Sequence, residues 1–230
     1  MDELGHRKRR WSALSAEDRQ AERRRLLIET GIDLIGGDGW AALTVRRIIE
    51  RAQLNPRYFY ESFADIEQLA VAVYDRIVEE LGAQVLAQLS TPGRDETEVV
   101  RAGVQVIVEF IDADRRRGRI LYAEAPGLEA VRRRRVEAGR AVVGFVEQYA
   151  ASQRPVPATD IAVGRVGAAF LVGGVSHLLA EWTAGHIKVS KLELIDDVTA
   201  MFLAVGDAAG AIAGAAAAVP TGRRGRTADS

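Results

Sequence analysis

The chain has 230 residues, of which 48% are hydrophobic and 27% are charged, and it contains no cysteine. This balance is typical of a folded soluble protein, excludes a disordered or membrane-embedded chain, and leaves room for one or two domains. Because there is no cysteine, neither disulfides nor thiolate metal sites can form, and we expect a cytoplasmic protein. The net charge is -1, so any affinity for nucleic acid must come from an uneven distribution of charge.

The two ends of the chain and its most apolar stretch exclude further classes. Residues 1–15 are basic and polar, without the hydrophobic run of a signal peptide, and residues 218–230 are of low complexity. We therefore expect disordered tails at both ends. Residues 161–180 are apolar and rich in glycine, but Arg165 and His177 favour a buried helix over a membrane span, so no membrane segment is expected.

Two helices are predicted before residue 53. Apolar residues recur at helical spacing between residues 16 and 35, and the glycines within residues 36–39 mark the end of the first helix. Thr44 is a suitable N-cap for a short amphipathic helix that ends near Ala52. Ala52 follows Ile48 by one turn, and its small side chain lets two helices cross closely.

A third helix is predicted to begin at Asn55-Pro56. Asparagine is a favoured N-cap, and proline suits the first helical position because its missing N–H costs nothing there. Leu54 and Phe59 have the spacing of a hydrophobic staple, which sets the angle at which the chain enters the helix. Two short helices joined by a turn of about three residues form a helix-turn-helix, whose second helix has the size that fits a DNA major groove.

The outer face of this third helix carries side chains that the core does not need. Arg57, Tyr58, Tyr60 and Glu61 offer a guanidinium, two phenols and a carboxylate. Such a set suits contacts with base edges and phosphates, so we predict that this helix reads DNA. An ordinary solvated helix face is the alternative interpretation.

The rest of the sequence predicts further helices and no strand. A long helical pattern runs from just after Asp65 to about Leu89 and connects the two halves of the chain. Turn residues separate the helices expected after it, at residues 96–113, 114–123, 128–151, 158–184 and 191–206 or beyond. We therefore expect an all-α protein.

The run Leu43-Thr44-Val45-Arg46-Arg47-Ile48 to Ala52, followed by Tyr60, Phe63 and Glu67 to Leu69, resembles the DNA-binding domain of the TetR family. The resemblance covers residues 20–75. It implies an all-α fold with an N-terminal three-helix helix-turn-helix DNA-binding domain at residues 16–65. It also implies a C-terminal helical bundle at residues 66–217 for ligand binding and dimerisation.

The resemblance implies DNA-contact roles for individual residues. Thr44 and Arg46 at the start of the second helix and Tyr60 on the third would contact phosphates. Arg57 and Tyr58 would read bases. With Asn55 at the head of the third helix, the predicted DNA-binding residues are Thr44, Arg46, Asn55, Arg57, Tyr58 and Tyr60.

Two positions depart from the family pattern. Gln53 stands at a turn position usually held by glycine, and Ile66 stands where a lysine usually contacts phosphate. The missing lysine is expected to weaken anchoring to the DNA backbone. The basic segment His6-Arg7-Lys8-Arg9-Arg10 could compensate by reaching DNA, and a merely solubilising tail is the alternative.

The resemblance further implies a homodimer that binds a double-stranded DNA operator and is released by a small apolar or amphipathic effector, with repression as the usual outcome. Residues 161–184 and 191–206 carry more apolar surface than one subunit readily covers, which favours dimerisation through these C-terminal helices. Two reading helices about 34 to 36 Å apart would address one palindromic operator.

An effector pocket is expected among the middle helices, although aromatic residues at helical spacing are also ordinary core. The candidate lining residues are Phe110, Tyr122, Phe145, Tyr149, Phe170, His177 and Trp182. His177 and Glu181 lie one turn apart, but no second such pair supplies further ligands, so neither a metal site nor a cofactor is expected. The arginines within residues 115–119 and 132–135 are expected to form a solvated face with nearby glutamates.

Two other classes of protein remain open. An architectural DNA-binding dimer without an effector would use the long C-terminal helices only to dimerise. An all-helical enzyme or carrier would carry a vestigial helix-turn-helix, but we find no nucleophile–base pair, phosphate loop or metal set, so no enzyme is expected. An enclosed apolar cavity would favour the effector-regulated protein, and a closed, filled bundle would favour the architectural one.

Overall fold

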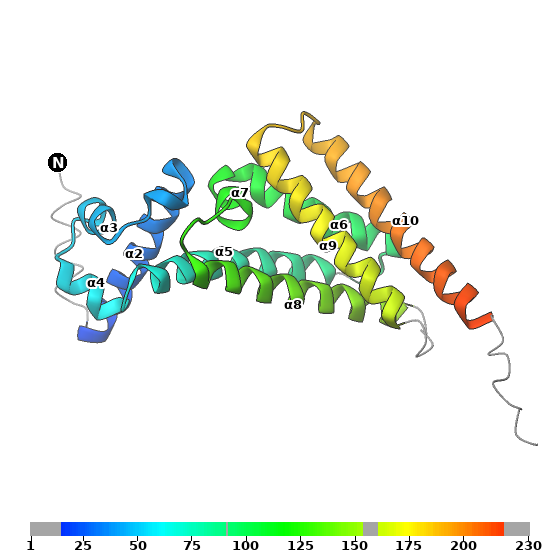
Figure 1. Cartoon of the computed structure of the whole chain (residues 1–230), viewed down its shortest axis with the longest axis horizontal. Helices are drawn as coiled ribbons and strands as arrows, with labels where there is room; N and C mark the ends of the chain where they lie inside the picture. The colour runs from blue at the N-terminus through cyan, green and yellow to red at the C-terminus, as the bar shows by residue number, and fades with distance from the viewer. Residues whose placement is uncertain (1–14, 91, 154–160, 219–230) are drawn as a thin grey trace, which may run out of the picture.

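The computed structural model describes residues 15–90, 92–153 and 161–218. Within these residues the fold consists of nine α-helices and one short 3-10 helix, with no strand, which confirms the predicted all-α class. Figure 1 shows an elongated molecule. A small N-terminal unit, residues 16–62, lies at one end of it, and the longer helices extend away from that unit. The elements are α2 (Ala16–Asp38), η1 (Trp40–Ala42), α3 (Val45–Ala52), α4 (Pro56–Ser62), α5 (Ile66–Leu89), α6 (Glu96–Ala113), α7 (Arg115–Tyr122), α8 (Glu129–Gln153), α9 (Ile161–Ala184) and α10 (Lys191–Ala218).

Local signals determine where α2 begins and ends. The Ser15 hydroxyl accepts a hydrogen bond from the N–H of Asp18 at 3.0 Å, and the Asp18 carboxylate accepts from the N–H of Ser15, which completes a capping box. At the other end Gly39 adopts a φ of 82°, which glycine tolerates without a Cβ clash. Its N–H donates to the carbonyl of Ile35 at 2.9 Å, so the chain leaves the helix at this residue.

The long helix α5 links the N-terminal unit to the remaining helices. The Asp65 carboxylate caps it by accepting from the N–H of Gln68 at 2.8 Å. Leu69, Val73 and Ile77 recur every four residues and are buried, so one stripe of α5 faces the core. Figure 1 shows α5 running away from the N-terminal unit with α8 beside it. Because α5 packs against α2 as well as α6, α7 and α8, it belongs to both parts of the molecule.

Helices α6 to α10 form the larger bundle, in which α10 packs on α6 and α9. Residues Val163–Ala184 of α9 are long and apolar enough to cross a membrane by length and composition. In this fold, however, α9 packs against α7, α8 and α10. Near its start the Arg165 guanidinium donates to the Glu147 carboxylate of α8 at 3.0 Å. The helix is therefore a member of the bundle.

The predicted helix bounds agree with the structure to within a few residues, with two exceptions. The short helix η1 was not predicted, and α10, expected over residues 191–206 or beyond, continues to Ala218 and so fixes an end that the prediction left open. The two expected disordered tails lie almost wholly outside the described residues, and so does the basic segment at residues 6–10. They remain predictions.

The short helix α7 docks onto the C-terminal end of α2. Its Arg119 guanidinium donates to the carbonyls of Gly36 at 2.6 Å and Gly37 at 3.0 Å. These carbonyls lie in the last turn of α2, where helix carbonyls lack partners within the helix. In return, the Trp40 indole N–H donates to the carbonyl of Arg119 at 3.3 Å. A cation and a tryptophan thus hold the N-terminal unit against the bundle.

The two arginine runs therefore differ from the expected solvated face. Arg132 does pair with Glu129 at 2.6 Å, as expected from their spacing. Arg117, in contrast, reaches Glu80 of α5 at 2.8 Å, and Arg134 reaches Asp75 of the same helix at 2.6 Å. These arginines join helices to each other.

Candidate nucleic-acid interface

The first helix of the helix-turn-helix, α3, begins at a side-chain cap. The Thr44 hydroxyl accepts a hydrogen bond from the N–H of Arg47 at 3.3 Å. Ile48 is fully buried and Ala52 is nearly so, one helical turn later. The small residue predicted at the helix crossing therefore lies in the core.

The turn between α3 and α4 depends on one residue with a left-handed backbone. Gln53 has φ 53° and ψ 42°, and it is the only non-glycine residue with positive φ among the described residues. Its N–H donates to the Glu50 carbonyl at 3.3 Å, and the N–H of Leu54 donates to the Ile49 carbonyl at 3.1 Å. These bonds satisfy the last carbonyls of α3 and turn the chain toward α4.

The second helix, α4, is short and firmly seated. The Asn55 side chain accepts from the N–H of Arg57 at 2.9 Å, and Pro56 occupies the first helical position, as predicted. Phe59 is completely buried, and its ring centroid lies 6.0 Å from that of Phe63, which is also buried. The inner face of α4 is thus anchored by two aromatic rings.

The predicted DNA-reading side chains lie on the outside of these helices. The Arg57 side chain is 82% exposed and the Arg46 side chain is 85% exposed. Tyr60 is 60% exposed, and Thr44 and Asn55 are also exposed. Tyr58 is less open, at 37%. All six predicted residues therefore lie at the surface, at the start of α3 or on α4 and its cap.

Helix α2 orders the outer face of α4, which the sequence reasoning missed. The Arg57 Nε donates to the Glu61 carboxylate at 2.8 Å, and Arg23 of α2 reaches the same carboxylate at 3.5 Å. The Arg23 guanidinium also lies over the Tyr58 ring, 4.4 Å from its centroid. Gln20 of α2 donates to the carbonyl of Glu61 at 3.1 Å. Arg23 and Glu61 are 38 positions apart in the sequence, so no local pattern could indicate this network.

Arg46 on α3 also has a carboxylate partner. Its Nε donates to Glu50, one turn later, at 2.8 Å. This hydrogen bond raises the pKa of Arg46 above its usual value, so the side chain stays cationic. A DNA phosphate would have to compete with Glu50 for the guanidinium. Because an exposed ion pair contributes little free energy, a phosphate could replace Glu50 as the partner of Arg46.

Helix packing separates the residues predicted for an effector pocket. Phe110 is buried on α6 beneath the Arg117 guanidinium, 4.0 Å from the ring centroid. Trp182 is buried on α9, where its indole N–H donates to the carbonyl of Val189 at 3.2 Å. Tyr122 is partly buried on α7, and burial raises the pKa of its phenol. These three are packed among other side chains.

The other four candidates are more open to solvent. Phe170 is 70% exposed on α9, His177 on the same helix is exposed, and Phe145 on α8 is 39% exposed. Tyr149 is half-buried near the end of α8. Glu181, the neighbour of His177, contacts the Nδ1 atom of His186 at 3.0 Å instead. The seven candidates remain a prediction for ligand contact.

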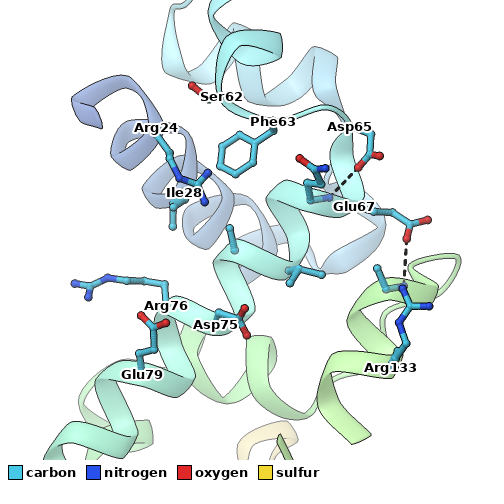
Figure 2. A pocket seen from close by; sticks show the side chains of 14 residues that line it. Arg24, Ile28, Ser62, Phe63, Asp65, Glu67, Asp75, Arg76, Glu79 and Arg133 are labelled. Atoms are coloured by element: carbon cyan, nitrogen blue, oxygen red, sulfur yellow. Dashed lines mark hydrogen bonds between the residues drawn. The ribbon is translucent and has the colours of Figure 1, made fainter. Parts of the chain in front are cut away.

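A cavity of about 690 Å³ lies elsewhere, between the N-terminal unit and the bundle. Side chains from α2, the α4–α5 turn, α5 and the first turns of α8 line it, and Figure 2 shows them around a hollow that opens to solvent. None of the seven predicted pocket residues is among its lining. No local sequence pattern could have indicated this cavity, because its walls come from segments as distant in the sequence as α2 and α8.

Comparisons with known proteins agree with this geometry. The family model for bacterial regulatory proteins of the tetR family matches residues 27–73, which run from α2 through the helix-turn-helix into α5. A TetR-like transcriptional regulator from Rhodococcus sp. RHA1 has a similar structure, with a TM-score of 0.61 and 16% identity over 82% of this chain and 96% of its own.

Two further solved structures share the fold. The fatty acid degradation regulator FadR from Bacillus halodurans has a TM-score of 0.65 and 13% identity, over 79% of this chain and 94% of its own. AibR, in complex with isovaleryl coenzyme A and operator DNA, has a TM-score of 0.59 and 20% identity, over 78% of this chain and 97% of its own. The helix-turn-helix and the helices around it thus match the family model for bacterial regulatory proteins of the tetR family, and most of the fold is shared with these regulators.

Proposed function

We propose that this protein is a transcriptional repressor that binds a palindromic DNA operator as a homodimer and is released by a small-molecule effector. The observation that carries the proposal is the exposed face of α4, which is presented on a rigidly capped and buried helix and ordered from α2. A helix of this size and surface fits a major groove.

In this proposal some of the exposed residues contact base edges and others contact phosphates. Arg57 and Tyr58 on α4 read base edges, because a guanidinium can form a bidentate pair with guanine. Thr44 and Arg46 at the start of α3, with Tyr60 on α4, contact phosphates and set the orientation of the protein on the duplex. Asn55 lies at the N-terminal end of α4, where the free backbone N–H groups favour an anion.

The dimer would form through α9 and α10. On the isolated chain Val166 and Phe170 are exposed one turn apart on α9, followed by the exposed glycines 173 and 174. On α10, Met201 is 61% exposed and Ile212 is 59% exposed. Large apolar side chains exposed on two neighbouring helices favour an interaction site, and a second subunit would cover them.

The fold also supports an effector-controlled protein. AibR, which shares this fold, was solved with isovaleryl coenzyme A and operator DNA together. In this chain α7 contacts both the last turn of α2 and the bundle, so a change in the bundle can move the reading helices. To release the protein from DNA, an effector must bind more tightly to the conformation that does not fit the operator than to the conformation that does.

An architectural dimer without an effector is a second candidate. One observation favours it: Phe110 and Trp182, two of the predicted pocket residues, are packed in the core. A protein of this kind would bend or coat DNA with little sequence preference. The experiment below separates it from a sequence-reading regulator.

The test uses Arg57→Ala in binding measurements with a selected operator and a random duplex. We expect a loss of about 1 to 3 kcal/mol on the operator and a relaxed preference at the base that Arg57 reads. Arg140→Ala on α8, which is exposed and far along the chain from α4, is the matched control and should change neither affinity. An equal loss on both duplexes would reassign Arg57 to phosphate contact.

A further inference from the structure

One carboxylate on α4 lies between two guanidinium groups. The Oε1 atom of Glu61 accepts a hydrogen bond from the Nε of Arg57 at 2.8 Å, and its Oε2 atom lies 3.5 Å from a terminal nitrogen of Arg23 on α2. Gln20, three residues before Arg23 on α2, donates to the backbone carbonyl of Glu61 at 3.1 Å. Helix α2 therefore holds Glu61 by its side chain and by its backbone.

Arg23 is committed to this carboxylate. Its side chain is only 13% exposed, and its guanidinium lies over the ring of Tyr58. Its Nε atom is buried and has no hydrogen-bond partner among the described residues, where Glu61 is the one carboxylate that pairs with it. A charge with so little access to water is costly without a counter-charge. Arg23 therefore keeps the Glu61 carboxylate beside α2.

Arg57 uses only part of its guanidinium within the protein. Its Nε is bonded to Glu61, whereas its two terminal nitrogens donate no hydrogen bond to the described residues. The donors of a guanidinium lie in one plane, so fixing the Nε also restricts the direction of the two terminal nitrogens. Those two nitrogens can form a bidentate pair with O6 and N7 of guanine in the major groove. The contact with Glu61 thus leaves the base-reading end of Arg57 open.

A second ion pair, on α3, shows what is particular to this arrangement. Arg46 and Glu50 are also four residues apart, and the Nε of Arg46 also donates to Oε1 at 2.8 Å. The side chain of Glu50 is 59% exposed, however, and in the described part of the chain no other cation pairs with it. The side chain of Glu61 is 32% exposed. An isolated exposed pair restricts its partners little, whereas a network anchored on a second helix restricts them more.

We propose that Glu61 and Arg23 are positioning residues that hold the Arg57 guanidinium in place for a guanine base of the operator. Arg23 fixes Glu61, and Glu61 orients Arg57 through its Nε. Arg57 then loses less conformational freedom on binding, which for one such side chain contributes roughly two- to twelvefold in affinity. This inference rests on the proposed function, to which it adds the base that is read and the two residues behind the contact.

The first test identifies the base. Binding sites are selected from random duplex DNA with the wild type and with Arg57→Ala. One position in each half-site should lose its preference in the variant, and the wild type should prefer guanine there. Replacement of that guanine by 7-deazaguanine, which lacks the N7 acceptor, should weaken binding of the wild type and leave that of Arg57→Ala unchanged. A preference of the wild type for another base at this position overturns the proposal.

The second test measures the positioning. The guanine preference is the ratio of affinities for the operator and for an operator with adenine at that position, about 5- to 150-fold for a bidentate pair. Glu61→Ala should lower this ratio by roughly two- to twelvefold, because Arg57 loses its orientation. Glu50→Ala, which breaks the matched pair on α3, is the control and should leave the ratio unchanged. Because the ratio compares two duplexes with the same protein, a partly folded variant still reports it.

The role of Arg23 is tested through Glu61. Arg23→Gln should lower the guanine preference, and the double variant Arg23→Gln/Glu61→Ala should lose no more than Glu61→Ala, since Arg23 acts through that carboxylate. Additive losses would mean that Arg23 acts through Tyr58, and they overturn its assigned role. A full guanine preference in Glu61→Ala overturns the proposal but leaves the proposed function intact. Selection of no specific site by the wild type contradicts the proposed function itself, and this inference with it.

Discussion

At the scale of single residues, Gln53 stands out in the N-terminal unit because it adopts a left-handed backbone conformation without being glycine. Its φ of 53° lies in the left-handed region, where a side chain with a Cβ costs roughly 1–2 kcal/mol and glycine costs nothing. The side chain is exposed, and within the described residues it forms no hydrogen bond. The turn therefore keeps its shape because the buried residues on either side, such as Ile48 and Phe59, impose it.

We expect Gln53→Gly to raise the free energy of unfolding by about 0.5 to 1 kcal/mol, because the relieved strain exceeds the added entropy of the unfolded chain. Denaturant unfolding of the full chain measures this. Gln84→Gly, in the exposed middle of α5, is the control and should lower stability by about 1 kcal/mol. A loss of stability at Gln53 would show that its side chain contributes a contact.

Asp114 is the titratable residue that ties α7 to the charge network at α2. A hydrogen bond from the Arg116 guanidinium lowers the pKa of Asp114 below its usual value, and Arg116 also pairs with Asp33 of α2. Because the folded pKa is lower than the unfolded one, the carboxylate stabilises the fold fully above the unfolded pKa of about 3.9. This contribution disappears as pH falls through the folded pKa.

The wild type should therefore be more stable than Asp114→Asn at neutral pH, by less than about 1 kcal/mol because the pair is partly exposed. Denaturant unfolding at a series of pH values measures the difference. It should shrink toward zero below about pH 3.9. A difference that is independent of pH would mean that the charge of Asp114 does not contribute.

At the scale of elements, the contact of α7 with α2 depends on a glycine. A Cβ at Gly36 would overlap the Cβ and Cγ atoms of Arg116. Those atoms are next to the backbone of α7 and cannot move without it. Only glycine at this position allows α7 to approach α2 closely enough for Arg119 to reach the last carbonyls of the helix.

We expect Gly36→Ala to lower the free energy of unfolding by about 1 to 3 kcal/mol, the usual cost of overpacking. Gly37→Ala is a matched control, because a Cβ at Gly37 would meet no atom within 4 Å and alanine favours a helix. Hydrogen exchange should show faster exchange of the α7 amides in Gly36→Ala alone. Equal stability of the two variants would contradict the close contact.

Element boundaries were predictable where a cap lies beside the helix it starts. Thr44, Asn55 and Asp65 each accept a hydrogen bond from an N–H two or three residues later, so the signal and its effect are local. The end of α10 was left open at residue 206 or beyond, because no cap or turn residue marks it, and the alanine-rich segment continues the helix to Ala218.

Contacts between distant elements were not predictable at all. Arg119 lies 83 residues from Gly36, and Arg23 lies 38 residues from Glu61. No spacing rule reaches across such separations, so the arginine runs suggested only a solvated face. For the same reason the DNA-contact residues proposed on α4 were predicted from their own helix alone. The network around them and the cavity beside α5 emerged only from the fold.

At the scale of the whole molecule, the exposed apolar side chains of α9 and α10 support the proposed dimer. Phe170 lies in the middle of the α9 face and is 70% exposed. Phe170→Glu should therefore convert a dimer into a monomer, because two carboxylates would be buried without partners. Sedimentation equilibrium measures the mass. Val142→Glu, on an exposed part of α8, is the control and should stay dimeric. A dimeric Phe170→Glu variant would place the interface elsewhere.

A monomer of this kind should also bind operator DNA much more weakly than the dimer, since each chain presents only one α4 to the duplex. Within one chain, the buried rings of Phe59 and Phe63 anchor α4 to the rest of the N-terminal unit. In the proposed dimer, recognition of a two-fold site would depend on the second subunit and on the angle that α5 and α7 set between the N-terminal unit and the bundle.

Selection of binding sites from random duplex DNA by the full wild-type chain tests the proposed function most directly. We expect enrichment of one two-fold symmetric sequence whose half-sites are about one helical turn apart, or a multiple of it, read by the α4 helices of two subunits. Recovery of no sequence beyond the charge-driven background, or of a single unpaired half-site, would contradict it.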